Sequence, residues 1–291
     1  MLSSDTRRNR LVGIALVSAT TLSFATLDCG AKWLVRSLPV IEVVWLRFAA
    51  HVLFTALLFA PSRGWALVRT RKPAMQALRV AFMCLMTGAN FWTLQYLQLA
   101  ETGSIQFAVP ILIALASGPL LGERIDARRW AAILVGFSGV LVILRPGTQG
   151  FHPAMLLAIF NVCLYAAFNL MTRHLAAHDA PEATQFLSAL GPAILLAPFA
   201  LAAWKMPTSA GEWAVAAVIG IAGGMGHYCL ALAHRFAPAS VLGPFLYQQI
   251  VWMVLFGWLA FDDLPAGAVL LGGAIVIGSG LYLIGRERAR S

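Results

Sequence analysis

Apolar residues fill long stretches of the chain, and short breaks that are charged or rich in Pro and Gly separate them. Each stretch is close to the roughly 20 residues that a helix needs to cross a membrane. No alternation of apolar and polar residues with a period of two runs through them, so helices are predicted rather than the strands of a barrel. The breaks divide the chain into ten predicted membrane-spanning helices, at approximately 11–31, 40–60, 76–99, 103–121, 128–145, 153–173, 182–203, 212–234, 239–260 and 266–285.

Composition supports a membrane protein. Hydrophobic residues make up 60% of the 291 residues and charged residues only 11%, with a mean hydropathy of +0.79. Soluble domains carry about 25% charged residues, so this composition excludes a soluble enzyme and a disordered chain. The four cysteines are far apart, without a CxxC or Cys/His spacing, and no metal site or cofactor is expected.

The positive charges indicate topology. The net charge is +9, and Lys and Arg gather at residues 7–10, 63–79 and 286–290, without the interleaved aromatic residues of a nucleic-acid surface. When the predicted loops are assigned to alternating sides, most of the 21 Lys and Arg fall on the side that holds both chain ends. The positive-inside rule then predicts a multi-pass protein of the inner (cytoplasmic) membrane with both termini in the cytoplasm. The lipid bilayer is its expected partner, and no nucleic acid is expected.

The two halves of the chain resemble each other. The first and sixth segments align at an offset of 141, which pairs Thr20 with Asn161, Phe24 with Tyr165 and Asp28 with Asn169. The sequences Gly136-Phe-Ser-Gly139 and Ile277-Gly-Ser-Gly280 correspond in the same way. We therefore expect two five-helix repeats, residues 1–147 and 148–291. Because five is odd, the repeats enter the membrane in opposite orientations, an architecture that recurs in secondary transporters.

Charged residues within predicted spans are candidates for function, because a charge at the bilayer centre costs about 2.5–3.5 kcal/mol. Asp28 and Lys32 lie one helical turn apart and are expected to neutralise each other in part. Arg47 and His51 are also one turn apart. The candidate proton or charge sites are Asp28, Arg47, His51 and His227. A purely structural role, as a local ion pair or a side chain reaching the interface, stays open.

Polar and aromatic residues predict a central cavity. Asn161, Tyr165 and Asn169 share one helix face at spacings of four, and their counterparts in the first segment share the same face. The cavity candidates are Phe24, Asp28, Trp92, Tyr96, Gln106, Asn161, Tyr165, Asn169, His227, Tyr228, Tyr247, Gln248 and Trp252. Pro110, Gly243 and Pro244 are the candidate hinge or kink positions. The alternatives are asparagines that join helices in packing and kinks that are static.

Short motifs resemble a known family. Leu120-Leu-Gly-Glu123-Arg124 at the end of the fourth segment, and Ala100-Glu-Thr-Gly-Ser104 followed by Pro110, are similar to motifs of the drug/metabolite transporter superfamily, specifically its EamA-type exporters. The second half departs from the pattern, with Phe261-Asp262-Asp263 where Gly-Glu is expected. The resemblance implies ten helices, a cavity lined mainly by the first, third, fourth, sixth, eighth and ninth helices, and export. The family's amino-acid exporters, including those for aromatic amino acids, are the nearest comparison.

The leading hypothesis is a secondary transporter, not an enzyme, that exports amino acids or related metabolites by alternating access. Amide groups and aromatic rings suit a small zwitterionic substrate, and a monomer would suffice. The alternatives are a transporter of another metabolite or drug, a channel, and an integral membrane enzyme that modifies lipids. No HExxH, GxSxG or P-loop motif supports the enzyme. The one compact polar group, His174, His178 and Asp179, lies in a loop and is expected to be solvated.

Overall fold

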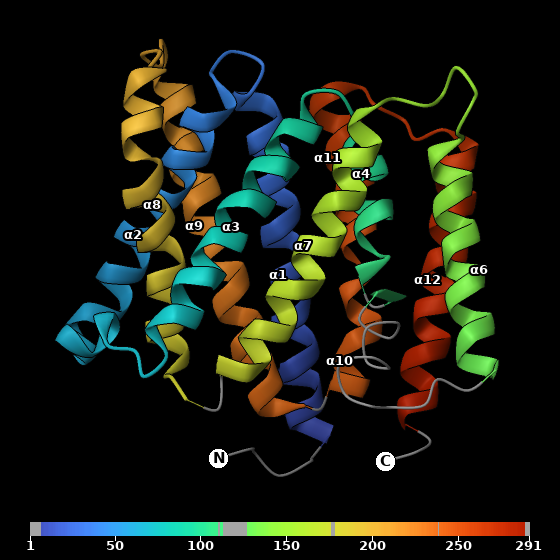
Figure 1. Cartoon of the computed structure of the whole chain (residues 1–291), viewed down its shortest axis with the longest axis horizontal. Helices are drawn as coiled ribbons and strands as arrows, with labels where there is room; N and C mark the ends of the chain where they lie inside the picture. Colours follow the sequence, from blue (N-terminus) through green and yellow to red (C-terminus); the bar gives the residue numbers. More distant parts are fainter. Residues whose placement is uncertain (1–6, 110, 113–126, 176–177, 238, 289–291) are drawn as a thin grey trace.

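The computed structural model describes the chain except residues 1–6, 110, 113–126, 176–177, 238 and 289–291 (Figure 1). Every regular element in the described part is helical. The elements are α1 (Arg7–Leu34), α2 (Val40–Arg63), the 3-10 helix η1 (Gly64–Val68), α3 (Pro73–Leu94), α4 (Leu99–Gln106), α6 (Ala127–Leu144), α7 (Ala154–Leu175), α8 (Pro181–Ala202), α9 (Ala210–Phe236), α10 (Ala239–Leu246), α11 (Gln249–Phe261) and α12 (Gly267–Arg288).

These helices form the ten predicted spans. Among the described residues, α1, α2, α3, α8 and α9 are long and apolar enough to cross a membrane by themselves, and α6, α7, α11 and α12 contain shorter apolar stretches. The ninth span consists of α10 and α11, which Tyr247 and Gln248 separate. The fourth begins as α4, and most of its later residues, including Pro110, lie outside the described residues. The fold is an all-α polytopic membrane protein of two inverted five-helix repeats.

Helix pairing shows the inverted symmetry. α1 packs along α9 and α3 along α7, whereas α2 packs on α8, α6 on α12 and α4 on α11. Exchange of the two repeats converts the α1–α9 pair into the α7–α3 pair and returns each of the other three pairs to itself. Figure 1 shows the equivalent helices α1 and α7 running in opposite directions, with the start of α1 and the end of α12 at the same end of the bundle. Every one of these pairs joins one repeat to the other.

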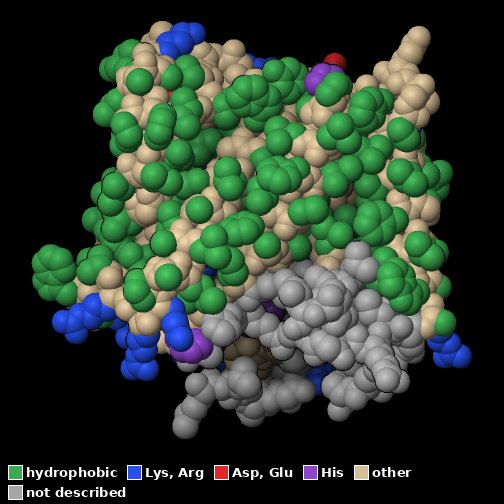
Figure 2. Space-filling view, in the orientation of Figure 1, with side chains coloured by type: hydrophobic (Ala, Val, Ile, Leu, Met, Phe, Trp, Pro, Cys, Tyr) green, Lys and Arg blue, Asp and Glu red, His purple; other side chains and the backbone are tan. Residues whose placement is uncertain are grey.

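The surface agrees with a membrane-embedded bundle. Figure 2 shows hydrophobic side chains over most of the height of one face, with Lys and Arg at its edges. Several of the Lys and Arg side chains gather at the edge that bears the chain ends. The placement of this edge in the cytoplasm stays a prediction.

Glycines bring α6 and α12 into backbone contact. A Cβ atom added at Gly139 would lie 2.8 Å from the carbonyl oxygen of Gly272, and one added at Gly272 would lie 2.6 Å from that of Gly139. Ser279 donates a hydrogen bond to the carbonyl oxygen of Ala132 across the same pair, at 2.6 Å. Close approach of backbones through small residues is the usual way that helices associate in lipid.

Asp179 corrects one expectation from the sequence. It is only 9% exposed, and it accepts hydrogen bonds from the backbone N–H of Arg71, at 2.8 Å, and from the side chains of Thr70 and Gln76. It therefore joins the α7–α8 connection to the α2–α3 connection rather than being solvated. Burial alone raises the pKa of Asp179, but these hydrogen bonds outweigh it and hold the pKa below the ordinary value.

The first prediction concerns the glycine contact. Gly139→Ala should lower the free energy of unfolding by about 1–3 kcal/mol, because the facing backbone has to move away. The matched control is Gly278→Ala in α12, where an added Cβ meets nothing within 4 Å. That substitution should be neutral or stabilising, since alanine is the better helix former. Thermal unfolding in detergent measures both, and equal melting temperatures would contradict the close packing.

The second prediction concerns Asp179. A carboxyl group whose pKa is lower in the folded state stabilises the fold above its unfolded pKa, and this contribution is lost as the pH falls. Wild-type stability should therefore decrease as the pH drops below about 4. Asp179→Ala should be less stable than wild type at pH 7, and the difference should shrink in acid. A difference that does not change with pH would show that the charge of Asp179 contributes nothing.

Candidate functional site

A cavity of about 330 Å³ lies between the two repeats. Helices α1, α2, α3, α4, α7, α9, α10 and α11 contribute to its wall, so both repeats form it. Eight of the predicted cavity residues line it: Phe24, Asp28, Gln106, Asn161, Tyr165, Asn169, His227 and Tyr247. Arg47, a predicted charge site, lines it as well. The sequence repeat therefore marks residues that the fold brings together.

The equivalent faces of α1 and α7 form much of the wall. On α7, the amide of Asn161 lies 3.4 Å from the Gln106 side-chain oxygen, and Asn169 donates to the carbonyl oxygen of Tyr165 at 2.7 Å. On α1, Phe24 and Asp28 line the cavity. Thr20 is fully buried instead and donates to the carbonyl oxygen of Gly226 on α9. The two faces are related in position but differ in chemistry.

Aromatic rings form the apolar part of the wall. Phe24 meets His227 edge-on, with ring centroids 4.9 Å apart, and Phe107 meets Tyr247 in the same way at 5.0 Å. Tyr165 lines the cavity from α7. Such rings offer faces on which a planar ligand can stack.

Four charged or titratable side chains, Asp28, Arg47, His51 and His227, cluster at or beside the cavity. Arg47 is 3% exposed and lies over the ring of Phe48, with its Cζ atom 4.1 Å from the ring centroid. His51, one turn further along α2, is buried but does not line the cavity, and it stacks on His227 at 6.4 Å. Asp28 accepts a hydrogen bond of 2.8 Å from Asn90. Opposite charges thus line one cavity without forming a direct ion pair.

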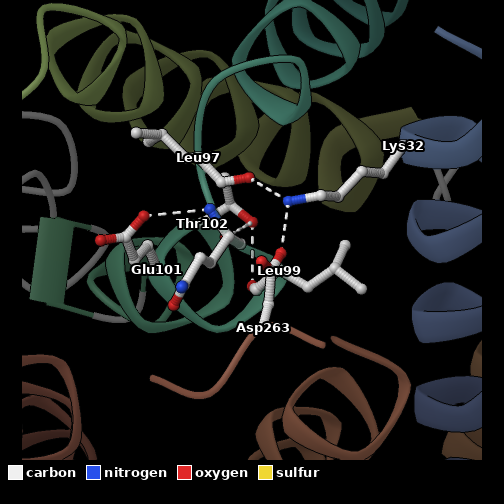
Figure 3. A network of polar contacts seen from close by, with 7 residues as sticks. Lys32, Leu97, Leu99, Glu101, Thr102 and Asp263 are labelled. Carbon is white, nitrogen blue, oxygen red and sulfur yellow. Dashed lines mark hydrogen bonds and ion pairs between the residues drawn. The ribbon is translucent and has the colours of Figure 1, made fainter. Parts of the chain in front are cut away.

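Lys32 does not pair with Asp28, contrary to the expectation from their spacing. Its ammonium group donates to the carbonyl oxygen of Leu97 at 2.8 Å and contacts the Asp263 carboxylate at 2.9 Å (Figure 3). These contacts join α1, the α3–α4 connection and the α11–α12 connection at the end of the bundle away from the chain ends. Lys32 lies one turn beyond Asp28, so this network, hereafter the Lys32 network, borders that end of the cavity.

Five candidates do not line the cavity. Trp92 and Tyr96 are 53% and 52% exposed, and Tyr96 stacks on His152. Tyr228 packs edge-on against Phe59. Gln248 accepts a hydrogen bond from Ser18 on α1, and Trp252 packs against the hydrophobic core.

The interrupted ninth span explains part of this difference. The interruption falls at Tyr247 and Gln248, about one turn after Pro244, and α10 is continuous through Gly243 and Pro244. Gln249 and Met253, rather than Gln248 and Trp252, line the cavity from α11. The hinge role of Gly243 and Pro244 stays a prediction, and Pro110 lies outside the described residues.

Some lining residues were not among the predicted cavity residues. Asn90, Phe107 and Gln249 contribute polar or aromatic surface. Asn90 and Gln249 are amides within apolar segments, which is the signal that could have found them. Phe107 carries no such signal, because phenylalanine is common on every face of these helices.

Two inverted repeats of membrane helices around a shared central cavity are an architecture that recurs among membrane transporters. A family model for the EamA-like transporter family matches residues 11–145 and again residues 152–286. The chain therefore belongs to this family, and each repeat carries one copy of its domain.

Related proteins carry different substrates. The chain is 30% identical to a riboflavin transporter of Rhizobium johnstonii, over 96% of this chain and 93% of that protein. It is 25% identical to an S-adenosylmethionine uptake transporter of Rickettsia prowazekii, with 98% and 96% covered. It is 24% identical to the pseudopaline exporter CntI of Pseudomonas aeruginosa, with 91% and 93% covered. A solved crystal structure has the same fold, with a TM-score of 0.66 at 22% identity, over 96% of this chain and 99% of that one.

The third prediction concerns the Lys32 network. Asp263→Asn should lower the free energy of unfolding by about 1–3 kcal/mol, because Lys32 is only 8% exposed and loses its counter-charge. The double variant with Lys32→Met should lose less than the sum of the two single variants. The control is Asp262→Asn, since Asp262 is exposed and asparagine tolerates its left-handed backbone. Strict additivity in thermal unfolding would contradict a direct pairing of Lys32 with Asp263.

Proposed function

We propose that the chain is a secondary transporter that carries a small metabolite with a planar ring system through the central cavity by alternating access. The observation that carries the proposal is the combination of aromatic faces and amide side chains around one cavity of about 330 Å³. This volume is at the lower end of the range for small-molecule sites. The named relatives are transporters, which supports transport rather than enzymatic chemistry.

Riboflavin is the first compound to test. Its flat ring system can stack on Tyr165 or Phe24, and its ring carbonyl, N–H and hydroxyl groups can bond to amides, which both donate and accept. The relative that is named as a riboflavin transporter matches nearly the whole chain. S-adenosylmethionine, named for another relative, also has a planar nitrogen heterocycle.

Amino-acid export, with aromatic amino acids included, is the second candidate. Asp28 and Arg47 line the same cavity with opposite charges. A zwitterion can place its ammonium group near the first and its carboxylate near the second. The relatives include an uptake transporter and an exporter, so flux has to be measured in both directions.

Alternating access requires a contact that forms and breaks at each end of the cavity. The Lys32 network supplies one at the end away from the chain termini, because it joins three separate elements of both repeats. Two charge-assisted contacts are few enough to exchange for water when that end opens.

The fourth prediction tests the function with purified protein in liposomes. Riboflavin inside the liposomes should accelerate the entry of labelled riboflavin, compared with liposomes that lack the protein. Tyr165→Leu and Asn161→Ala should each reduce this exchange by about two- to tenfold, since each removes about 0.5–1.5 kcal/mol of stacking or hydrogen bonding. The control is Tyr282→Leu, because Tyr282 is 48% exposed on α12 and lies outside the cavity.

The same liposomes distinguish the two candidate substrates. Phenylalanine, tryptophan, threonine and methionine replace riboflavin in parallel assays, with and without a pH gradient. Flux of amino acids without riboflavin exchange would favour the second candidate. No flux of any compound by folded protein would contradict both.

A further inference from the structure

The helical bundle buries two arginines whose surroundings differ. Arg79 on α3 is 6% exposed, and its guanidinium donates to the Thr172 hydroxyl at 2.9 Å, to the Thr184 carbonyl oxygen at 3.2 Å and to the Ser188 hydroxyl. Neutral oxygens of the protein therefore satisfy the hydrogen-bond donors of this guanidinium. It has a structural role that joins α3 to α7 and α8.

Arg47 on α2 has no such partners. It is 3% exposed, yet its Nε and Nη1 atoms are buried without a hydrogen bond. None of the carboxylates in the described residues forms an ion pair with it. Asp28, which lines the same cavity, is hydrogen-bonded to Asn90 instead.

A glycine on α9 leaves room for the Arg47 guanidinium itself. A Cβ atom at Gly223 on α9 would lie 3.2 Å from Nη2 and 3.3 Å from Nε of Arg47. His51 stands one turn along α2, and both its ring nitrogens are buried without a partner. His227 stacks on His51 and lines the cavity. Unsatisfied N–H donors of Arg47 therefore lie at one cavity wall, and the unsatisfied ring nitrogens of His51 lie directly behind it.

A buried guanidinium in this state is unfavourable. It keeps its proton in proteins, so it cannot become neutral, and its desolvation has to be offset by an anion or by several hydrogen bonds. Arg79 has those hydrogen bonds from the protein, and Arg47 does not. None of the described residues supplies this group to Arg47, so an anion bound in the cavity is the candidate for it.

We propose that Arg47, with His51 and His227 beside it, forms a binding site for a small monovalent anion in the cavity wall. A carboxylate fits best, because the planar guanidinium can bond both its oxygens at once. The bound anion can come from two sources. One is the carboxylate of the transported molecule itself, and the other is a free anion such as chloride that accompanies a neutral substrate such as riboflavin. The proposal rests on the proposed function only in placing the site within the substrate cavity.

Binding is tested on the full chain in detergent, without transport. Chloride binding is followed by the broadening of the chloride NMR line, and acetate is added as a competitor. Arg47→Gln should weaken binding by at least about thirtyfold, the usual effect of removing one member of a buried charged pair. Arg47→Lys should bind with intermediate affinity. Thermal unfolding establishes that each variant is folded.

Arg79→Gln is the matched control, since it removes a buried arginine of the same kind whose donors the protein satisfies. It should bind chloride as wild type does, even if its melting temperature falls. Equal chloride and acetate binding by wild type and Arg47→Gln would overturn the proposal. So would the absence of any binding to wild type at physiological salt concentrations.

Liposome assays identify the source of the anion. If the substrate supplies it, chloride should compete with phenylalanine flux, and phenylalaninamide should not compete. If the anion is free, riboflavin exchange should fall to background when sulfate replaces chloride. Because the binding assay needs no substrate, failure of riboflavin transport leaves the anion site standing. Conversely, transport without anion binding at Arg47 would overturn the site alone.

Discussion

The hydrocarbon layer offers polar groups no partner, and the structure is organised around this constraint. Within this layer backbone groups have to be satisfied inside helices, and each buried polar side chain has to find its partner inside the bundle or in a ligand. Polar side chains consequently gather between the two repeats. Asn90 with Asp28, Gln106 with Asn161, and Lys32 with Asp263 are all contacts between separate elements of the bundle, and the latter two join the two repeats. The cavity lies among these contacts.

Inverted symmetry determines where the cavity forms but not what it binds. The pairs α1–α9 and α3–α7 exchange with one another, so the faces of α1 and α7 meet the cavity from related directions. The side chains on them have diverged: Asp28 on one face corresponds to Asn169 on the other. Under the proposed function, backbone symmetry allows the two repeats to exchange conformations, and the difference in side chains gives the bound molecule a defined orientation.

The sequence predicts the spans well, because the length of an apolar run follows directly from the thickness of the bilayer. It also predicts the lining faces of α1 and α7, because the spacing of four residues and the repeat agree. Aromatic residues are a weaker signal, since the surroundings are apolar outside the bundle as well as inside. Trp92 and Tyr96 are thus as stable on the exposed surface as in a cavity. The partner of Lys32 could not be predicted either, because Asp263 is 231 residues away and ordinary local spacing favoured Asp28.

Helix packing and the cavity wall largely use different residues in this fold. Backbone contacts at Gly139 and Gly272 and the hydrogen bonds of Arg79 hold helices together and leave the cavity untouched. Arg47, Tyr165 and Asn161 face the cavity, and the first and last of them retain polar atoms without a partner. Asn161 does both, because its amide also contacts Gln106 of α4 across the two repeats. This partial separation is compatible with relatives that are 24–30% identical over nearly the whole chain and whose names record riboflavin, S-adenosylmethionine and pseudopaline.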